Sequence, residues 1–293
     1  SNSGKDFFTI LTCLNELGYS VEWRIISASD YGYPQKRKRI YLFCYHKSSI
    51  LFDRLNENYE DIVFKKGILA KAFKHFSSDK KHNIFEIGND VSKIAYEKKR
   101  NPFLNSGLLQ NNTIHTFNST PIYKGKKTVL NDILQDINVV DKSYYIDFNE
   151  KLKVPIKKIM RIGNDKILYT KGDYWRYKKG LKREWKINKT SGYKYQYDEG
   201  AMNLFDDLNS PSRTIVTNEI SKTPNRITHL IKQGNVIRNL TPIELEKLNM
   251  FPENHTYTDS IPIRKRGFLM GNALVVGLIE KIGKELQKEI FKS

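Results

Sequence analysis

A chain of 293 residues with a mean hydropathy of −0.57 can form one large domain or two ordinary ones, and it has no apolar run near the roughly 18 residues of a membrane span. Its 50 lysines and arginines exceed its 32 aspartates and glutamates by 18, which favours a polyanionic partner, and no strongly amphipathic basic helix supports a membrane role. Two cysteines are too few for a disulfide framework, so we expect a reducing, cytoplasmic location, and we expect no metal site.

The chain begins with a predicted helix and two predicted strands. Apolar residues recur at helical spacing over Lys5–Leu17, so this segment predicts a helix. Ser20–Ile26 alternates apolar residues with Glu22 and Arg24, which is typical of a strand with one polar face. The large apolar residues of Ile40–Phe43 predict a buried strand. Because two strands and one helix cannot bury a core, the remaining strands of this sheet must come from elsewhere.

A run of polar residues leads into the second strand: Gln35, Lys36, Arg37, Lys38 and Arg39. Side chains alternate along an extended chain, so Arg37 and Arg39 are predicted to point the same way. Two guanidinium groups fixed at a sheet edge suit a phosphate or the edge of a base. On charge pattern alone, the alternative is a basic loop tip that is merely solvated.

After residue 45 the pattern becomes irregular. Short helices are predicted at Ser49–Asn58 and Thr128–Val139, and short strands between Asp147 and Ile220. Asp173–Tyr197 interleaves aromatic with basic residues, a combination that suits contact with a nucleic-acid backbone and its bases. The alternative is a β-ribbon with aromatic residues packed inward and lysines outward. Both interpretations can hold together, because a β-ribbon can enter a major groove, and we favour DNA contact. The candidate DNA contacts in this segment are Arg176, Lys178, Lys182 and Arg183.

Three segments near the C-terminus carry further signals. In Ser210–Thr217, a proline turn starts a strand-like run, Thr214–Val216. Thr241–Leu248 reads as a helix start, with threonine at the cap, proline at the first position and Glu244 completing a capping box. Gly271-Asn272-Ala273 precedes an apolar helix whose N-terminus could offer free amides to an anion, although a buried core helix after a turn is the alternative.

These stretches resemble, in the same order, the motifs of DNA cytosine-5 methyltransferases. Pro34–Tyr41 resembles their Gln-x-Arg-x-Arg motif, and Ser210–Thr217 resembles their Arg-Pro-Ser-x-Thr-Ile segment. Asn239–Pro252 is similar to their Leu-Thr-Pro segment that ends in Phe-Pro, and Arg266–Val276 to their final Gly-Asn-(Ala/Ser)-Val motif. The resemblance covers essentially the whole chain, with a variable insert after the first motif.

The resemblance implies roles for individual residues. Arg39 would hold the flipped cytosine and the adjoining backbone, Arg37 would orient the site and Gln35 would shape the loop. Arg213 joins the DNA-contact candidates, although its segment mainly organises the recognition domain. The implied contacts to S-adenosylmethionine are three consecutive residues, Gly271, Asn272 and Ala273.

The resemblance also implies a fold and its division. We expect an α/β fold, a partial S-adenosylmethionine-dependent methyltransferase sheet, with an irregular α+β target-recognition domain. Residues 1–45 would belong to the catalytic domain, 46–258 would form the target-recognition domain, and 259–293 would return a C-terminal helix to the catalytic domain.

Part of the family's machinery is absent from the sequence. The family uses a Gly-rich loop, a Pro-Cys nucleophile and a Glu-Asn-Val segment, and no Pro-Cys occurs here. Cys13, in a predicted helix, and Cys44, in a predicted strand, are expected to be core residues. The chain therefore looks like the C-terminal part of a bacterial, nucleoid-associated methyltransferase, inactive alone, whose partners are duplex DNA and an N-terminal half or subunit.

The alternative is a stand-alone, sequence-specific DNA-binding module without catalysis. We expect the apolar faces of the helix over Phe7–Leu17 and of the last helix to be exposed in this chain, which argues against such a free-standing protein.

Overall fold

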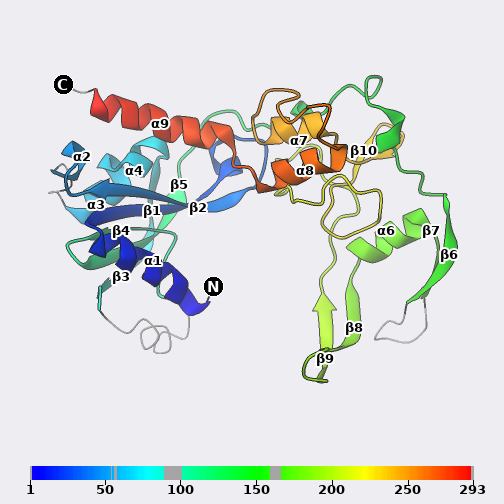
Figure 1. The fold of residues 1–293 in the computed structure, drawn as a ribbon, viewed down its shortest axis with the longest axis horizontal. Helices are drawn as coiled ribbons and strands as arrows, with labels where there is room; N and C mark the ends of the chain where they lie inside the picture. Colours follow the sequence, from blue (N-terminus) through cyan, green and yellow to red (C-terminus); the bar gives the residue numbers. More distant parts are fainter. Residues whose placement is uncertain (1, 54, 56–57, 89–100, 159–165, 292–293) are drawn as a thin grey trace. The chain divides into compact units, whose positions relative to one another are not determined.

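The computed structural model describes residues 2–53, 55, 58–88, 101–158 and 166–291, and its chain divides into two compact units (Figure 1). Unit 1 comprises Ser1–Lys127 and Val276–Ser293, and unit 2 comprises Thr128–Val275. The boundaries predicted after residues 45 and 258 differ from these, because much of the segment after residue 45 belongs to unit 1.

A five-stranded antiparallel sheet forms the centre of unit 1. Its order is β2-β1-β4-β5-β3. The strands are β1 (Tyr19–Ser27), β2 (Lys38–His46), β3 (His75–Glu86), β4 (Ser106–Gln110) and β5 (Thr113–Pro121). The first two confirm the strands predicted from the sequence. The other three come from the segment that was assigned to the recognition domain, and they supply the missing partners of β1.

Helices cover both faces of this sheet (Figure 1). On one face, α1 (Lys5–Glu16) packs Leu11 against Val21 and Trp23 of β1. On the other face lie α4 (Ile68–Ala72) and α9 (Val276–Ile290), with the short helices α2 (Ile50–Asp53), α3 (Tyr59–Asp61) and the π-helix η3 (Ile62–Lys66). The apolar faces of the first and last helices are therefore largely packed within unit 1, which corrects the expectation that they are exposed. Of the helix predicted over Ser49–Asn58, the described part is α2, and residues 54, 56 and 57 lie outside the described residues.

The edge strand β2 is less buried than the sequence predicted. Ile40 is 45% exposed and Leu42 is 38% exposed, and their register partners on β1 are Ile25 and Trp23. Trp23 is covered by α1, but Ile25 is 36% exposed, so the apolar surface continues from β2 onto β1. Apolar side chains at an uncovered sheet edge are an unusual feature of an isolated domain.

Glu22 and Arg24, the polar residues of the alternating pattern of β1, are buried. The Glu22 carboxylate accepts from the backbone N–H groups of Leu69 (3.1 Å) and Ala70 (2.9 Å), and from the Tyr45 hydroxyl (3.0 Å). Arg24 donates to backbone carbonyl oxygens on the same segment, including that of Leu69 at 3.1 Å. The pair therefore satisfies the free backbone groups at the two ends of the short helix α4.

Unit 2 consists of short elements. Its strands are β6 (Lys151–Lys158), β7 (Lys166–Thr170), β8 (Lys182–Ile187), β9 (Lys194–Glu199), β10 (Ile231–Gln233) and β11 (Val236–Arg238), and they pair consecutively as three two-stranded ribbons. Its α-helices are α6 (Lys171–Lys179), α7 (Pro242–Leu248) and α8 (Ile263–Asn272). Short 3-10 turns complete the described chain: η4 (Leu130–Asp132) and η5 (Lys142–Tyr144) here, and η1 (Asn2–Gly4) and η2 (Ala28–Tyr31) in unit 1.

Among the elements predicted in unit 2, the start of one helix is confirmed, and another helix and a strand are wrong. The capping box of α7 is confirmed: the Thr241 N–H donates to Glu244 Oε2 at 2.8 Å, and the Glu244 N–H to Thr241 Oγ1 at 3.2 Å. The helix predicted over Thr128–Val139 is wrong, since it contains only η4 as helical structure. The strand predicted at Thr214–Val216 is also wrong, because the Val216 N–H donates to the Glu219 side chain instead of a neighbouring strand.

Candidate functional site

The basic motif of unit 1 lies in the tight connection between β1 and β2. Ser27 pairs with Lys38, and the Ala28 N–H donates to the Arg37 carbonyl oxygen at 3.1 Å, which closes the loop. Gly32 has φ 88°, and a Cβ there would overlap the Tyr123 hydroxyl, so glycine is required on both counts. The Tyr33 hydroxyl donates to the carbonyl oxygen of Gly277 at 2.7 Å. This bond ties the loop to the first turn of α9.

The three candidate catalytic residues of this loop differ sharply in burial. Gln35 is fully buried, Arg37 is 3% exposed, and Arg39 is exposed, with Nη1 donating to the Lys38 carbonyl oxygen at 2.7 Å. Burial, together with the nearby positive charge of Arg39, lowers the pKa of Arg37 to about 10. Burial raises the pKa of Tyr41, and the charges of both arginines oppose this shift. The loop therefore combines buried, fixed residues with one cation at the surface.

Neither cysteine has the surroundings of an activated nucleophile. Cys13 is exposed on α1, which corrects the expectation of a core position. Cys44 is half-buried on β2, and burial raises the pKa of its thiol, so the thiolate is disfavoured. In the described ranges of the chain, no group of three His, Cys, Asp or Glu side chains could hold a metal ion. The described helices also include none that is long and apolar enough to cross a membrane.

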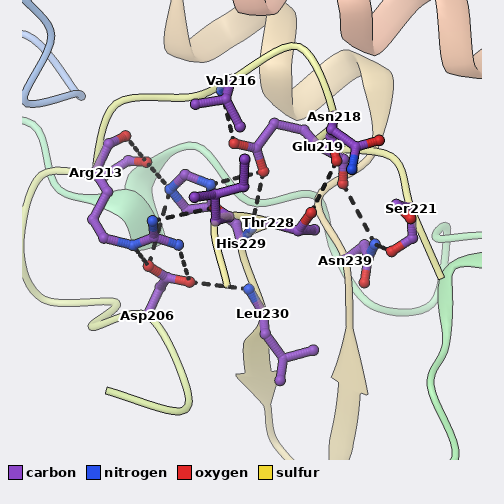
Figure 2. Close-up of polar contacts among 12 residues, drawn as sticks. Asp206, Arg213, Val216, Asn218, Glu219, Ser221, Thr228, His229, Leu230 and Asn239 are labelled. Carbon is purple, nitrogen blue, oxygen red and sulfur yellow. Dashed lines mark hydrogen bonds and ion pairs between the residues drawn. The ribbon is translucent and has the colours of Figure 1, made fainter. Parts of the chain in front are cut away.

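The Ser210–Thr217 segment of unit 2 is held by a network of buried polar groups (Figure 2). Asp206 is its first centre: it forms an ion pair with Arg213, accepts from the Leu230 N–H at 3.0 Å and lies 3.7 Å from Lys179 Nζ. Although burial alone would raise the pKa of Asp206, the charges of His229, Arg213 and Lys179 bring it below its usual value. Arg213, a candidate DNA contact, is thus engaged in an intramolecular ion pair.

His229 is the second centre of this network. Its Nε2 lies 2.9 Å from Ser212 Oγ, and its Nδ1 lies 2.9 Å from Glu219 Oε2. This order of serine, histidine and carboxylate is also found in hydrolases. Here Ser212, His229 and Glu219 are 2%, 0% and 1% exposed, so a substrate cannot reach them. The network instead fixes the segment that precedes and follows Ile215, a residue of the unit 2 core.

The final glycine motif packs against the same segment. Gly267 and Gly271 lie four residues apart on α8, and a Cβ on Gly267 would meet the Ile220 side chain at 2.9 Å. A Cβ on Gly271 would overlap the backbone of Val216 and Thr217. The two glycines therefore allow a close approach of helix and segment. The triplet forms the C-terminal end of α8 and precedes α9, which begins at Val276, so the prediction that an apolar helix follows the triplet is confirmed.

The remaining cofactor candidates follow Gly271 directly. Asn272 is exposed, and its side-chain amide donates to the Phe268 carbonyl oxygen at 3.2 Å. Ala273 is half-buried at the end of the helix, where it packs against the core of unit 2.

The candidate DNA contacts of the aromatic–basic segment occupy a helix and a hairpin. Arg176 is exposed on α6, 3.8 Å from Asp173, and Lys178 lies 5.2 Å above the Tyr174 ring. The helix α6 was not predicted from the sequence, although a Thr170–Asp173 capping box could have revealed it. Lys182 is only 8% exposed and is paired with Glu199, whereas Arg183 on β8 is 44% exposed, with its Nε 3.9 Å from Asp198 Oδ1.

The sequence did not reveal two structural features that support these segments: the buried pair of Glu22 and Arg24, and the network around Asp206 and His229. No short sequence pattern predicts either feature, because Glu22 and Asp206 bind backbone groups that are far away in the sequence, at Leu69 and Leu230. The structure brings Gln35, Arg37 and Arg39 together in unit 1, and it places the triplet at Gly271 and the aromatic–basic segment in unit 2.

Comparison with known proteins gives the same family for the whole chain. The family model described as "C-5 cytosine-specific DNA methylase" matches residues 1–288. The Type II methyltransferase M.Sau3AI of Staphylococcus aureus is 36% identical over 291 residues, which are 98% of this chain and 63% of that protein. The Type II methyltransferase M.DsaV of Dactylococcopsis salina is 30% identical over 135 residues, 44% of this chain and 37% of that protein. This chain thus spans less than two thirds of the length of M.Sau3AI.

Among solved structures, the chain resembles the Entamoeba histolytica methyltransferase EhMeth with a TM-score of 0.48 and 12% sequence identity, over 98% of this chain and 59% of that one.

Proposed function

Because the chain belongs to the C-5 cytosine-specific DNA methylase family, we propose that it forms the DNA-recognition part of a DNA cytosine-5 methyltransferase. The complete enzyme transfers a methyl group from S-adenosylmethionine to C5 of a cytosine in a specific duplex sequence, as part of a restriction–modification system. The family match over residues 1–288 carries this proposal. The naming of M.Sau3AI as a Type II methyltransferase supports it.

The nucleophile of this reaction is proposed to come from outside the 293 residues. A thiolate must attack C6 of the cytosine before C5 can accept a methyl group, and the sequence contains no Pro-Cys. Cys13 is exposed and Cys44 is half-buried, and neither adjoins a proline. Neither lies in the loop that connects β1 to β2. A segment with the Gly-rich loop, Pro-Cys and Glu-Asn-Val, either a preceding part of the same protein or a second subunit, would complete the site.

The exposed edge of β2 is the proposed docking position of that segment. Among the described strands, β2 pairs only with β1, so the backbone groups on its other side have no strand partner. Ile25, Ile40 and Leu42 expose apolar surface beside this edge. A further strand would satisfy the backbone groups and cover these side chains. A free-standing DNA-binding module, the alternative function, gives no reason for this exposure.

The cofactor candidates fit S-adenosylmethionine in part. Asn272 offers an exposed carboxamide that could contact a polar group of the cofactor. The backbone of Val216 and Thr217 occupies the space where a side chain of residue 271 would lie. Gly271 therefore allows close packing and is a poor contact surface for the cofactor. When bound, the cofactor supplies the methyl group. Within this chain, Asn272 and Ala273 would border it, and the other contacts would come from the docking segment.

Arg39 is the proposed contact to the flipped cytosine or its phosphate. It is exposed and positioned by the first residues of β2, whereas Arg37 is buried and can only orient the loop. Many cations share non-specific DNA binding, but the flipped base depends on few contacts. Arg39→Ala should therefore slow single-turnover methylation roughly a hundredfold, the equivalent of about 2–3 kcal/mol, and change duplex affinity only slightly.

The matched control for Arg39 is Lys38→Ala, since Lys38 is exposed and its side chain alternates to the opposite face of β2. An equal loss of rate in both variants would contradict the assigned role of Arg39.

Methyl transfer from labelled S-adenosylmethionine tests the function itself. The chain alone should transfer no label to mixed-sequence duplex DNA. The chain mixed with a separately produced polypeptide that carries the Pro-Cys segment should label C5 of cytosine, and a serine in place of that cysteine should abolish the label. Turnover by the chain alone would refute the external nucleophile. Absence of cytosine labelling by a stable mixture of the two polypeptides would refute the function.

A further inference from the structure

The hairpin formed by β8 and β9 has two chemically different faces. In its antiparallel register, Lys182 faces Glu199, Trp185 faces Gln196 and Ile187 faces Lys194. Because side chains alternate along each strand, Lys182, Glu184 and Lys186 share one face with Tyr195, Tyr197 and Glu199. The opposite face, which we call the outer face, carries Arg183, Trp185, Ile187, Lys194, Gln196 and Asp198.

The face that carries Lys182, Glu184 and Lys186, which we call the inner face, makes contacts within unit 2. The Tyr177 hydroxyl of α6 donates to Glu184, and Lys182 forms an ion pair with Glu199. Glu199 also lies 3.1 Å from Nε of Arg226. These contacts fix the orientation of the hairpin on α6, so its outer face is presented in a defined direction. Figure 1 shows the ribbon of β8 and β9 extending away from the rest of unit 2.

The outer face exposes large apolar side chains that no packing explains. Trp185 is 59% exposed and Ile187 is 64% exposed, and Tyr193, in the adjoining turn, is 69% exposed. The other two tryptophans of the chain, Trp23 and Trp175, are fully buried. An apolar patch on a projecting ribbon costs solubility without adding stability, so it indicates a binding surface.

The tip of the hairpin is ordered by its own hydrogen bonds. The Asn188 N–H donates to the Tyr193 carbonyl oxygen at 2.9 Å, and the Asn188 side chain accepts from the Thr190 N–H at 2.9 Å. Gly192 has φ +69°, a conformation that favours glycine. The tip thus has a defined shape before any partner binds, which lowers the entropic cost of binding.

Charge and shape select duplex DNA as the occupant. The outer face and the tip carry Arg183, Lys189 and Lys194 against one carboxylate, Asp198, in a chain of net charge +18. A two-stranded ribbon fits the major groove of B-DNA, where the methyl group of thymine is the apolar feature that a protein can read. Lys194 Nζ lies 5.4 Å from the centre of the Trp185 ring, so a phosphate-binding cation adjoins the apolar surface.

We propose that the outer face of this hairpin enters the major groove, with Trp185 and Ile187 against a thymine methyl group and Arg183 and Lys194 at flanking phosphates. This inference rests on the proposed function, since it assigns the specificity-determining surface of that methyltransferase. It differs from the candidates chosen from charge alone, because Lys182 lies on the inner face and is paired.

Binding by the full chain tests the proposal without catalysis. Duplexes enriched from a random library by the wild-type chain give its preferred site. Replacing the thymines of that site by uracil removes only the methyl groups, and should weaken wild-type binding roughly tenfold at one position. Trp185→Ala should weaken binding to the thymine duplex to a similar extent and become insensitive to uracil. The preferred duplex should also protect the wild-type chain's exposed tryptophan from quenching by acrylamide.

The matched control is Tyr169→Ala, which removes an aromatic side chain 58% exposed on β7, in another ribbon of the same unit. It should bind like the wild type, and both variants should keep the wild-type unfolding temperature, since neither residue is buried. If Trp185→Ala retains wild-type affinity and uracil sensitivity, or if Tyr169→Ala loses as much, the inference is wrong while the proposed function stands. If the wild-type chain binds no duplex even at low salt, both fail.

Discussion

Removal of the Glu22 side chain should unfold unit 1 far more easily than removal of an ordinary strand residue. Glu22→Ala takes the acceptor from the N–H groups of Leu69 and Ala70 and from the Tyr45 hydroxyl, all of them buried. Three unsatisfied donors cost on the order of 1 kcal/mol each. Counted instead as the loss of one partner from a buried ion pair, with Arg24 3.7 Å away, the same change costs about 3–5 kcal/mol.

The lower end of that range is expected, because Arg24 keeps its bonds to backbone carbonyl oxygens, such as 2.8 Å to that of Phe73. The two ways of counting therefore agree on a loss of about 3 kcal/mol in the free energy of unfolding of unit 1. Glu22→Gln keeps the size and one acceptor oxygen, so its loss should be smaller.

Native-state hydrogen exchange of the β1 amides measures this loss for unit 1 separately from unit 2. The double variant Glu22→Ala/Arg24→Met is the informative control, since it removes the orphaned charge and should be less destabilised than the sum of its single changes. A change of less than about 0.5 kcal/mol for Glu22→Ala, the range typical of surface positions, would refute the role assigned to this pair.

Burial and the charge of Arg24 lower the pKa of His75 to about 3, so only the unfolded chain takes up this proton between about pH 6.5 and 3. Unit 1 should thus lose up to about 1.4 kcal/mol per pH unit as the pH falls through this window, and urea titrations of His75→Phe should show a shallower slope. Gly271→Ala, forced against Thr217, should destabilise unit 2 by about 1–3 kcal/mol in thermal unfolding, whereas Gly283→Ala on α9, which meets no atom within 4 Å, should not destabilise the chain. Duplex affinity of the full chain should fall steeply with salt, by about 0.9 in the log–log slope per neutralised phosphate, and a flat profile would contradict the role of the positive charge.

Local patterns predicted the elements that depend on local interactions. The periodicity of Lys5–Leu17 and Ser20–Ile26 gave α1 and β1, and the Thr241–Glu244 capping box gave the start of α7. The position of Gln35, Arg37 and Arg39 at the entry of a strand was likewise readable, because alternation and turn residues are short-range properties.

Features that depend on distant partners were not predictable in the same way. The burial of Glu22 and Arg24 is determined by a helix more than 40 residues away. The register that joins β1 to β4 pairs residues such as Val21 and Leu109, so β4, which the sequence assigned to the recognition domain, belongs to the sheet of unit 1. The exposure of the outer face of the β8–β9 hairpin could not be predicted either. Aromatic and basic residues give the same sequence pattern whether the aromatic side chains pack inward or face solvent.

Unit 1 is assembled from two stretches of chain that are separated by the whole of unit 2. During synthesis, residues 1–127 emerge before unit 2, but Ile282 joins their core and Glu289 forms its 2.8 Å ion pair with Lys71 only when α9 has left the ribosome. Folding of the first half is thus completed after the second, a recognised source of aggregation-prone intermediates. The same topology gives residues 128–275 the character of a cassette: both of its ends join unit 1, so another module could replace it without altering any strand of the five-stranded sheet.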